Sequence, residues 1–323
     1  MIYVSPYQQE VKRQLPYYLA MEEYIARNRP EDDLWFMWIV DPTVIIGRNQ
    51  LLQKEVNIEY CKSRGIDLVR RKSGGGCVYA DAGNIMFSYI CHSNEVETTF
   101  RRYTSRIAEM LCSLGLNAEA TGRNDVTVDG LKVSGNAFYH IPGRSIVHGT
   151  MLFDTDFEVM AHAICPPAIK LQSKGIDSVR SRVCMLADKL DMDIRQFQDA
   201  VRSYLSDSEI VLTADDDMAI QEIAATYRQP EWFNGHNPQA DFSYVKRIDG
   251  VGTVQADIKV KGGCIASMIL SGDFFELQSL SFIYDRLAGV VYDRESVQLA
   301  LADIDVGQYI ANLMTNEFIN IIF

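Results

Sequence analysis

Long hydrophobic runs are absent from this 323-residue sequence. No stretch of 18 apolar residues occurs in it, so the sequence predicts no membrane-spanning helix. The first residues, MIYVSPYQQEVKRQ, contain no uninterrupted apolar segment of the kind that signal peptides carry. We therefore expect a soluble protein of the cytoplasm that does not act on a membrane.

Positive charge is scarce. The chain has 31 lysines and arginines against 43 aspartates and glutamates, which gives a formal net charge of -12. Proteins that bind nucleic acid non-specifically need a broad cationic surface, so we expect no nucleic-acid partner. Any basic binding site in this chain has to be local.

Cysteine patterns typical of metal sites are also missing. The seven cysteines are an odd number and include no CxxC motif or Cys/His cluster. We expect free thiols in a reducing compartment. Cys77 and Cys165 are the positions at which a nucleophilic thiol is worth considering. Neither has a histidine and an aspartate at a recognisable spacing, which favours buried apolar roles for both.

The nucleotide-binding motifs GxxxxGK[ST] and GxGxxG before a helix do not occur. The chain has instead RRKSGGGCVYADAGN at residues 70–84. Successive glycines leave backbone N–H groups accessible, and Arg70, Arg71 and Lys72 add positive charge. This stretch predicts a loop that binds a phosphate-bearing ligand. The alternative is an ordinary glycine-rich hairpin with solvated arginines.

Hydrophobic periodicity predicts a mixed α/β chain. Helical spacing covers residues 16–28, with Pro16 in the first turn, and residues 98–116, ending near Gly115. Strands are predicted over residues 34–40, 43–47, 66–71, 77–80 and 85–90. Residues 155–230 have mostly helical spacing, with an extended interruption at 175–183.

The pair Asp129-Gly130 lies between two alternating segments, which is a strong signal for a β-hairpin. In this hairpin Thr127 should face Lys132 and Asp125 should face Ser134. These four polar residues would share one face, and Val126, Val128, Leu131 and Val133 the other. Asp125 and Lys132 would then be diagonal neighbours that can serve one ligand without forming a tight ion pair.

A second, smaller domain is predicted at the C-terminal end. The segment EWFNGHNPQADF breaks the helical pattern with Pro, Gly and Asn, so we place a boundary near residue 240. The chain would divide into a large domain, residues 1–240, and a small domain, residues 241–323. A hairpin around Gly262-Gly263 and two short helices are expected in the small domain.

Three residues of the large domain are candidates for chemistry. Lys132 could neutralise a carboxylate and then the charge that develops on an attacked phosphate. Asp125 could bind Mg²⁺ as a hard oxygen ligand. His148 could transfer a proton or position a ligand. The ordinary alternatives are a solvated strand lysine, a strand-entry cap and a structural histidine.

Six segments resemble lipoate-protein ligases of the bacterial two-domain type in order and spacing, and GDFF at 272–275 is similar to part of their C-terminal domain. The six are IIGRNQ (45–50), RRKSGGGCVYADAGN (70–84), GRND (122–125), KVSGNAF (132–138), HGTMLFD (148–154) and KGIDSVRSRV (174–183). The resemblance therefore covers nearly the whole chain.

This resemblance implies an α/β (α+β) fold: a catalytic domain like that of biotin and lipoate ligases, with mixed β-sheets flanked by helices, and a small α+β C-terminal accessory domain. It implies an enzyme that uses ATP and Mg²⁺ to activate lipoate, releasing pyrophosphate and holding lipoyl-AMP. The lipoyl group would then pass to a lysine of an acceptor. The acceptors would be lipoyl domains of 2-oxoacid dehydrogenase E2 subunits and the glycine cleavage H protein. We expect a monomer.

The resemblance also implies roles for individual residues. Lys132 would be catalytic. Contacts with ATP or the adenylate would come from Arg71, Gly76, Cys77, Val78, Tyr79, Asp125 and Lys132. Contacts with lipoate would come from Lys132, Arg70, Gly75 and His148. Asp125 is the candidate Mg²⁺ ligand.

Two positions depart from the family pattern. Tyr139 stands where many members have an arginine, and Val147-His148 replaces a frequent pair of histidines. Both departures concern details of nucleotide contact rather than the type of reaction. Three apolar residues are either walls for the acyl chain or part of the core: Trp38, Val78 and Phe87.

Other functions on the same residues stay open at this stage. One is an octanoyl or lipoyl transferase that works through an acyl-cysteine, although no cysteine lies between Cys112 and Cys165. Another is a non-catalytic protein that binds lipoate or an adenylate, against which the presence of Arg71, Asp125 and Lys132 argues. A biotin ligase is a third, but its GRGRxG pattern is missing.

Overall fold

The computed structural model describes residues 1–323 except residue 94 and the segments 122–123, 165–181 and 235–240. The chain divides into two compact units. The first contains Met1–Ile45, Gln53–Arg70 and Val78–Phe233, and the second contains Ile46–Leu52, Arg71–Cys77 and Asn234–Phe323. The second unit therefore includes the glycine-rich loop as well as the C-terminal part of the chain.

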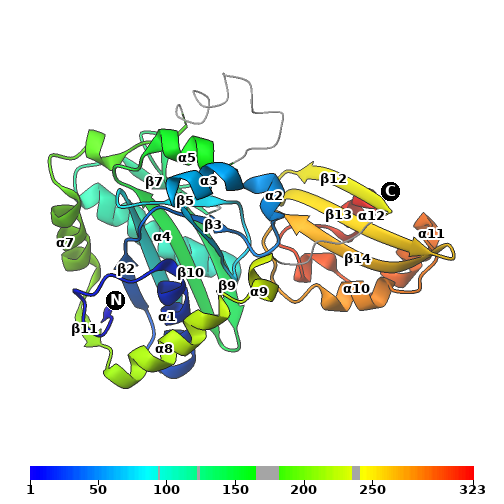
Figure 1. The fold of residues 1–323 in the computed structure, drawn as a ribbon, viewed down its shortest axis with the longest axis horizontal. Helices are drawn as coiled ribbons and strands as arrows, with labels where there is room; N and C mark the ends of the chain where they lie inside the picture. Colours follow the sequence, from blue (N-terminus) through cyan, green and yellow to red (C-terminus); the bar gives the residue numbers. More distant parts are fainter. Residues whose placement is uncertain (94, 122–123, 165–181, 235–240) are drawn as a thin grey trace. The chain divides into compact units, whose positions relative to one another are not determined.

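The first unit contains an eight-stranded sheet in the order β11-β1-β2-β6-β10-β9-β8-β7 (Figure 1). Its strands are β1 (Ile2–Ser5), β2 (Leu34–Trp38), β6 (Asn84–Cys91), β7 (Ala118–Ala120), β8 (Asp125–Val128), β9 (Leu131–Ile141), β10 (Arg144–Leu152) and β11 (Ser208–Val211). β1 pairs in parallel with β2 and with β11. All other neighbouring strands of this sheet, in the order β2-β6-β10-β9-β8-β7, are antiparallel. The sheet is therefore mixed, as predicted.

A small sheet in the order β4-β3-β5 also belongs to this part of the chain. Its strands are β3 (Thr43–Ile46), β4 (Asp67–Arg70) and β5 (Val78–Ala80). The strand predictions for residues 43–47, 66–71 and 77–80 are confirmed to within one or two residues. The glycine-rich loop is the connection between β4 and β5.

Several helices belong to the chain before residue 235, and some of them pack on the two faces of the large sheet. These helices are α1 (Leu15–Asn28), α2 (Leu52–Glu55), α3 (Ile58–Arg64), α4 (Val96–Ser113), α5 (Phe157–Ala163), α7 (Ile194–Leu205), α8 (Ala214–Thr226) and α9 (Pro230–Asn234), with the 3₁₀ turn η2 (Leu186–Asp188). α1 packs on β6 and β10 with α8 beside it, and α4 packs on β8 and β10 from the other face (Figure 1).

The helix predictions hold at particular residues. α1 has Pro16 in its first turn, and Gly115, with φ +85°, follows α4 in the left-handed region that favours glycine. The prediction that residues 155–230 are mostly helical missed β11, a short exposed strand on the edge of the large sheet. The predicted extended interruption at 175–183 lies almost entirely outside the described residues.

The predicted hairpin forms between β8 and β9, with positive φ at both Asp129 and Gly130. Thr127 pairs with Lys132 as expected. A bulge at Val133 then shifts the register, so that Asp125 pairs with Gly135 rather than with Ser134. The prediction that Ser134 lies on the polar face was wrong: it pairs with Val126 and is 1% exposed.

The second unit contains an antiparallel sheet of β12 (Phe242–Ile248), β13 (Gly252–Lys261) and β14 (Cys264–Gly272). The expected hairpin at Gly262-Gly263 joins β13 to β14. Two helices were predicted after it, and this was wrong. Three α-helices and one 3₁₀ turn follow: α10 (Ser281–Leu287), α11 (Arg294–Ala300), η3 (Val306–Gln308) and α12 (Thr315–Ile321).

A continuous apolar core joins the sheet of the second unit to these helices. Val254, Ala256 and Ile258 of β13 are fully buried in it, together with Leu287 and Phe318 of the helices. Burial on this scale stabilises the C-terminal fold through the apolar area that is removed from water.

The cysteines described are free thiols, as expected: Cys61, Cys77, Cys91, Cys112, Cys184 and Cys264. Cys165 lies outside the described residues. No helix in the described part of the chain combines the length and the apolarity needed to cross a membrane.

Candidate active site

The large sheet aligns three residues, two of them polar, in a row on the face that α1 covers. Ala137 of β9 pairs with His148 of β10, and His148 pairs with Ser88 of β6. Directly paired residues on neighbouring strands point to the same face, so these three side chains lie side by side. Glu22 of α1 contacts the row from above it.

A second row lies two residues along the same strands, on the same face. Trp38 pairs with Met86, and Met86 pairs with Thr150. The Thr150 hydroxyl accepts a hydrogen bond from the Gly135 N–H at 3.3 Å, and Gly135 pairs with Asp125. Because side chains alternate along a strand, this row and the row of His148 share one surface of the sheet.

Lys132 and Asp125 form an ion pair at the outer end of the second row. The Lys132 Nζ lies 2.8 Å from the Asp125 Oδ1, and the two side chains are 41% and 30% exposed. A β-carbon on Gly135 would lie 2.8 Å from the Lys132 Cε and Nζ. The lysine therefore reaches the carboxylate by crossing the bare backbone of Gly135.

This pair corrects one expectation from the sequence. Asp125 and Lys132 were predicted to avoid a tight ion pair because they would be diagonal neighbours. The bulge at Val133 places Gly135 opposite Asp125 instead, and that opens the path for the Lys132 side chain.

His148 is held by a buried hydrogen-bonded chain. Its Nδ1–H group donates to the Glu22 Oε2 at 2.9 Å, and the side chains are 6% and 0% exposed. The Ser88 hydroxyl also donates to Glu22, at 2.5 Å, and accepts from the Trp38 Nε1–H at 2.9 Å. A buried carboxylate without such partners would be strongly destabilising, so Glu22 needs these hydrogen bonds. The bond to Glu22 in turn fixes the orientation of the His148 ring.

Tyr139, one of the departures from the family pattern, lies near this buried carboxylate. Its ring centroid is 6.1 Å from that of His148. Burial raises the pKa of the Tyr139 phenol, and nearby Tyr227 and the negative charges of Glu22 and Glu23 raise it further. Tyr139 therefore places a neutral phenol beside the Glu22–His148 pair.

The three proposed acyl-chain walls separate in the structure. Trp38 lies on the face of His148, where it stacks on Tyr18 with ring centroids 5.0 Å apart. Phe87 pairs with Gly149 and points to the opposite face, where it stacks on Trp35. Phe87 is therefore part of the core. Val78 is partly buried in β5.

Arg70 is buried at the end of β4. Its Nε–H group donates to the Phe233 carbonyl at 2.8 Å, and the Trp232 indole N–H donates to the Arg70 carbonyl at 3.0 Å. The side chain is 2% exposed. These contacts tie β4 to α9. Tyr79 of β5 is also buried, and burial followed by the charges of Asp81 and Asp156 raises the pKa of its phenol.

Arg71 is placed in the second unit, where it fastens the glycine-rich loop from inside. Its guanidinium donates to the Ser73 hydroxyl at 2.8 Å and to the carbonyls of Gly74 and Gly76 at 2.6 and 2.8 Å. Only 4% of the residue is exposed. The hydrogen bonds of the guanidinium therefore fix the path of the loop, and its charge makes the electrostatic potential at the loop more positive.

The three glycines of the loop have different surroundings. The Gly75 N–H donates to the Phe274 carbonyl at 3.2 Å, and a β-carbon on Gly74 would lie 2.5 Å from that oxygen. Beside Gly76, by contrast, no heavy atom of the described chain other than those of Gly76 and its two neighbours lies within 4 Å of the position of a β-carbon. Gly76 is exposed, as Cys77 is in part. Gly76 is therefore the open glycine of the loop.

The structure brings some of the predicted residues together. Lys132, Asp125 and His148 share one face of the large sheet, with Thr150 and Ala137 between them. Arg71, Gly75, Gly76 and Cys77 belong to the second unit, and Arg70, Val78 and Tyr79 flank them in the first. Sequence reasoning missed Glu22 and Ser88, because an acidic residue within an apolar helix and a serine within a buried strand match no motif.

No group of three or more His, Cys, Asp or Glu side chains suited to a metal ion occurs among the described residues. Asp125 supplies one carboxylate, which the Lys132 ammonium already approaches. Mg²⁺ usually keeps several waters and is bound through one or two carboxylates together with substrate phosphates. The chain therefore fits a Mg²⁺ that arrives with a phosphate ligand rather than one held by protein alone.

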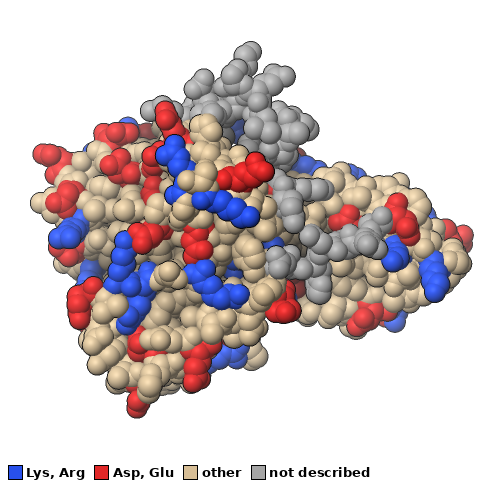
Figure 2. All heavy atoms as spheres, in the orientation of Figure 1, with Lys and Arg blue, Asp and Glu red and all other residues tan. Residues whose placement is uncertain are grey.

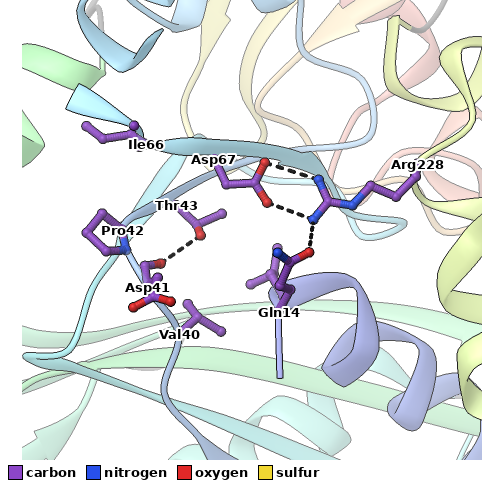
Figure 3. Close-up of a pocket in the computed structure, with 10 residues that line it drawn as sticks. Gln14, Val40, Asp41, Pro42, Thr43, Ile66, Asp67 and Arg228 are labelled. Carbon is purple, nitrogen blue, oxygen red and sulfur yellow. Dashed lines mark hydrogen bonds and ion pairs between the residues drawn. The ribbon is translucent and has the colours of Figure 1, made fainter. Parts of the chain in front are cut away.

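A cavity of about 490 Å³ lies elsewhere in the first unit (Figure 3). Arg228 on its wall pairs with both oxygens of Asp67, at 3.1 and 2.9 Å, and with the Gln14 side chain at 2.6 Å. None of the predicted site residues lines this cavity. Since its arginine and carboxylate satisfy each other, we do not place the chemistry there.

Charged side chains of both signs occur on the face shown in Figure 2. Lysines and arginines alternate with aspartates and glutamates among the residues drawn there in colour.

Two family models match the chain. The model of the Lipoyl protein ligase A/B catalytic domain matches residues 15–206, and that of the Bacterial lipoate protein ligase C-terminus matches residues 237–322. Among curated proteins, Lipoate--protein ligase 1 of Staphylococcus aureus is 35% identical over 312 residues, covering 94% of this chain and 95% of that protein. Lipoate-protein ligase LplJ of Bacillus subtilis is 34% identical over 317 residues, covering 94% and 96%.

Solved structures have the same fold. P. falciparum LipL1 in complex with lipoate has a TM-score of 0.78 at 18% identity, covering 99% of this chain and 97% of that one. A bi-partite lipoate protein ligase from Thermoplasma acidophilum, described with its E2 lipoyl domain, has a TM-score of 0.65 at 27% identity, covering 75% and 98%. A lipoate-protein ligase A bound with ATP has a TM-score of 0.61 at 25% identity, covering 73% and 97%. The chain therefore belongs to the lipoate-protein ligase family of enzymes.

Proposed function

We propose that this enzyme activates lipoate with ATP to give lipoyl-AMP and pyrophosphate, and then transfers the lipoyl group to a lysine of an acceptor protein. Membership of the lipoate-protein ligase family supports lipoate as a substrate, and the relative solved with ATP supports ATP. The observation in this chain that carries the proposal is the sheet face that joins the Lys132–Asp125 pair to the buried Glu22–His148 pair.

The first step brings two anions together. A lipoate carboxylate oxygen attacks the α-phosphorus of ATP, a new P–O bond forms, and the bond to the β-phosphate breaks so that pyrophosphate leaves. Lys132 offsets the repulsion between the carboxylate and the phosphate and stabilises the charge of the transition state. It forms no covalent bond, so the contribution of the chain is positioning and electrostatics.

The second step transfers the acyl group. The ε-amine of the acceptor lysine attacks the acyl carbon of lipoyl-AMP, AMP leaves, and the amine loses a proton as the amide forms. Exclusion of water before this step protects a reactive mixed anhydride from hydrolysis. The acceptors proposed are lipoyl domains of E2 subunits, as supported by the relative described with its E2 lipoyl domain, and the H protein.

The acyl chain of lipoate is proposed to lie along the shared sheet face. Asp125 and His148 are two strands and two residues apart, which corresponds to about 12 Å from the usual spacings of a β-sheet. That distance suits an extended medium-chain acid with its carboxylate at Lys132. Trp38 and Ala137 are the wall residues on this face, and His148 with Glu22 closes its far end.

The nucleotide is proposed to contact Lys132 and the residues around the glycine-rich loop. Gly76 and Cys77 offer exposed backbone, and Arg71 adds positive charge from within the loop. The remaining members of the proposed set are Val78 and Tyr79 for the nucleotide and Arg70 and Gly75 for lipoate. Asp125 is the proposed Mg²⁺ ligand, acting together with the phosphates of ATP.

Three further proposals concern the whole protein. The catalytic domain spans residues 1–240 and the accessory domain residues 241–323. The protein works as a monomer, which size-exclusion chromatography with light scattering tests. Its location is the cytoplasm, and the free thiols of the described chain support a reducing compartment.

Transfer through an acyl-cysteine is the second candidate function. Among the described cysteines, Cys184 lies beside Lys132 along the backbone, where its N–H donates to the Lys132 carbonyl at 2.9 Å. Its thiol is buried, and burial raises its pKa, which makes it a poor nucleophile. Replacing all seven cysteines by alanine or serine should leave ATP-dependent lipoylation intact. Loss of acyl transfer in a folded variant would favour the thiol route.

The direct test is pyrophosphate release from the purified enzyme with ATP, Mg²⁺ and lipoate, followed by intact mass of an apo lipoyl domain. Lys132→Ala should abolish release. Lys189→Ala is the matched control, because Lys189 forms a similar exposed ion pair with Asp129 at 3.0 Å near the hairpin turn. Full activity of Lys132→Ala, or release that does not need lipoate, would overturn the proposal.

A further inference from the structure

Residues 272–276 of the second unit run directly against the glycine-rich loop. Besides the hydrogen bond from the Gly75 N–H to the Phe274 carbonyl, the Phe275 ring lies over Gly75. A β-carbon on Gly75 would be 3.2 Å from the Phe275 Cε1, and one on Gly74 would be 3.2 Å from the Phe275 Cα. The close approach of this segment therefore leaves little room for a side chain on Gly74 or Gly75.

The same segment is fixed to a second loop, residues 46–52. The Gly272 N–H donates to the Asn49 carbonyl at 2.8 Å, and the Asn49 side-chain amide donates to Glu276 at 3.2 Å. The Arg48 Nε lies 3.4 Å from the same carboxylate, whose side chain is only 8% exposed. Phe275 thus lies between two anchored ends, which leaves its backbone little freedom.

Phe275 and Arg71 meet over the bare Cα of Gly75. A β-carbon there would be 3.1 Å from the Arg71 Nη2, in addition to its contact with the Phe275 ring. The same guanidinium holds the carbonyls of Gly74 and Gly76. The ring and the guanidinium therefore both border the Cα of Gly75, and the guanidinium sets the path of the backbone up to the open Gly76.

We propose that Phe275 is a positioning residue for adenylate formation, acting through Arg71 and the glycine-rich loop. The proposal rests on the proposed function, which assigns Gly76 and its neighbours to the nucleotide. Three consecutive glycines have the largest conformational entropy to lose, so a loop of this composition needs external contacts to hold one geometry. Phe275 supplies such a contact and itself touches no substrate.

The test compares Phe275→Ala with Phe282→Ala. Phe282 belongs to the same unit and stacks on Tyr309 with ring centroids 5.6 Å apart, but it is 51% exposed and lies in α10 rather than beside the loop. Phe275→Ala should raise the KM for ATP and lower kcat/KM for pyrophosphate release, on the order of tenfold. Phe282→Ala should behave as the wild-type protein does. Phe275→Leu, which keeps apolar volume, should restore part of the loss.

A second measurement does not depend on catalysis. Trypsin cuts after arginine and lysine, and Arg71 and Lys72 lie in the loop that Phe275 confines. Phe275→Ala should be cut there several times faster than the wild-type protein under native conditions, with the fragments identified by mass spectrometry. Phe282→Ala should not. Thermal unfolding shows that each variant is folded, and Phe275→Leu provides the measurement if the alanine variant is not.

The outcomes separate the two proposals. A wild-type enzyme that releases no pyrophosphate refutes the proposed function, while faster cleavage of Phe275→Ala would still support the effect of Phe275 on the loop. If a folded Phe275→Ala has the cleavage rate and the KM for ATP of the wild-type enzyme, the positioning role is refuted. A fall in kcat without any change in the KM for ATP or in cleavage would also refute it.

Discussion

Lys132 and Asp125 pair across the bare backbone of Gly135, with 2.8 Å between the Nζ and Oδ1 atoms. The pair exists because one extra residue in β9 moves Gly135 opposite Asp125. Both side chains are partly exposed, so the ion pair itself contributes little to stability. Its significance is that the ammonium is held over one end of the sheet face to which the reaction is assigned.

Gly135→Ala should therefore displace the Lys132 ammonium without removing the lysine. A β-carbon would lie 2.8 Å from the Lys132 Cε and Nζ, so the flexible lysine has to move away while the strand backbone stays intact. We expect pyrophosphate release to fall on the order of a hundredfold, as for other small displacements of a catalytic group. The measurement is the rate at saturating ATP and lipoate, beside a thermal unfolding curve.

Thr127→Ala is the control for this variant. Thr127 pairs directly with Lys132 across the hairpin, but its hydroxyl donates to the Glu119 carbonyl at 3.4 Å, and a β-carbon on Gly135 would not meet it. Its rate should stay within about twofold of wild type, as for a surface substitution away from the site. Equal losses in both variants would show that the hairpin, and not the placement of the amine, limits the reaction.

Alanine substitutions at Gly74 and Gly76 should differ in their effect on the free energy of unfolding. Gly74→Ala would place a β-carbon 2.5 Å from the Phe274 carbonyl oxygen, a backbone atom that cannot swing away. We expect it to cost about 1–3 kcal/mol in the free energy of unfolding, as overpacking does. Gly76→Ala meets open space in the described chain and should change that free energy by less than about 0.5 kcal/mol.

Gly76→Ala, which should leave stability unchanged, should nevertheless weaken the use of ATP. Gly76→Ala puts a methyl group where the proposed nucleotide approaches, so the KM for ATP should rise although the protein is as stable as the wild type. Urea unfolding and pyrophosphate release measured on the same preparations test both halves. A Gly76→Ala enzyme with an unchanged KM for ATP would remove Gly76 from the proposed site.

Much of this site could be predicted from local sequence. The Asp129-Gly130 turn fixed the pairing of Thr127 with Lys132, because the two-residue turn determines the register of the strands beside it. Pro16 and Gly115 marked the ends of two helices for similarly local reasons. The family resemblance then gave the expected enzyme, a lipoate-protein ligase, which the comparisons confirm, whereas the adenylate route stays a proposal.

The missed features depend on contacts between distant parts of the chain. The bulge at Val133 has no glycine or other signal in the sequence, since any residue can occupy it. Glu22 stands in an apolar helix, and only its approach to His148, 126 residues away, explains it. The contact of Gly75 with Phe274 likewise joins segments that no local pattern relates. β11 was missed because its exposed four residues show no alternation.

The buried Glu22–His148 pair should show strong energetic coupling. His148→Ala would leave a carboxylate that is 0% exposed without its imidazole partner, which should cost about 3–5 kcal/mol in the free energy of unfolding. Adding Glu22→Gln should recover part of that cost, because the remaining group is neutral. A double-mutant cycle by urea unfolding measures the coupling, and additive effects of the two changes would contradict a direct pair.

The anchoring of α8 should make the first unit sensitive to acid. Asp216 in its first turn accepts hydrogen bonds from the Thr213 N–H at 2.7 Å, from the Arg29 guanidinium at 2.8 Å and from the Tyr24 hydroxyl. Burial opposes ionisation of this carboxyl, but the hydrogen bonds from Tyr24 and Thr213 and the charge of Arg29 outweigh it and lower its pKa.

The sign of the pH effect follows from that shift. Because the pKa of Asp216 is lower in the folded than in the unfolded chain, its contribution is fully present above the unfolded value of about 4 and is lost as the pH falls through the folded value. Asp216→Asn should therefore lower the Tm at pH 7 and flatten the decline of Tm as the pH falls below about 4. Asp215→Asn, one residue away and exposed, should leave both unchanged. Parallel acid limbs for the wild type and Asp216→Asn would show that another carboxylate governs the transition, with the Asp217 contacts to Arg13 and Tyr17 the next to examine.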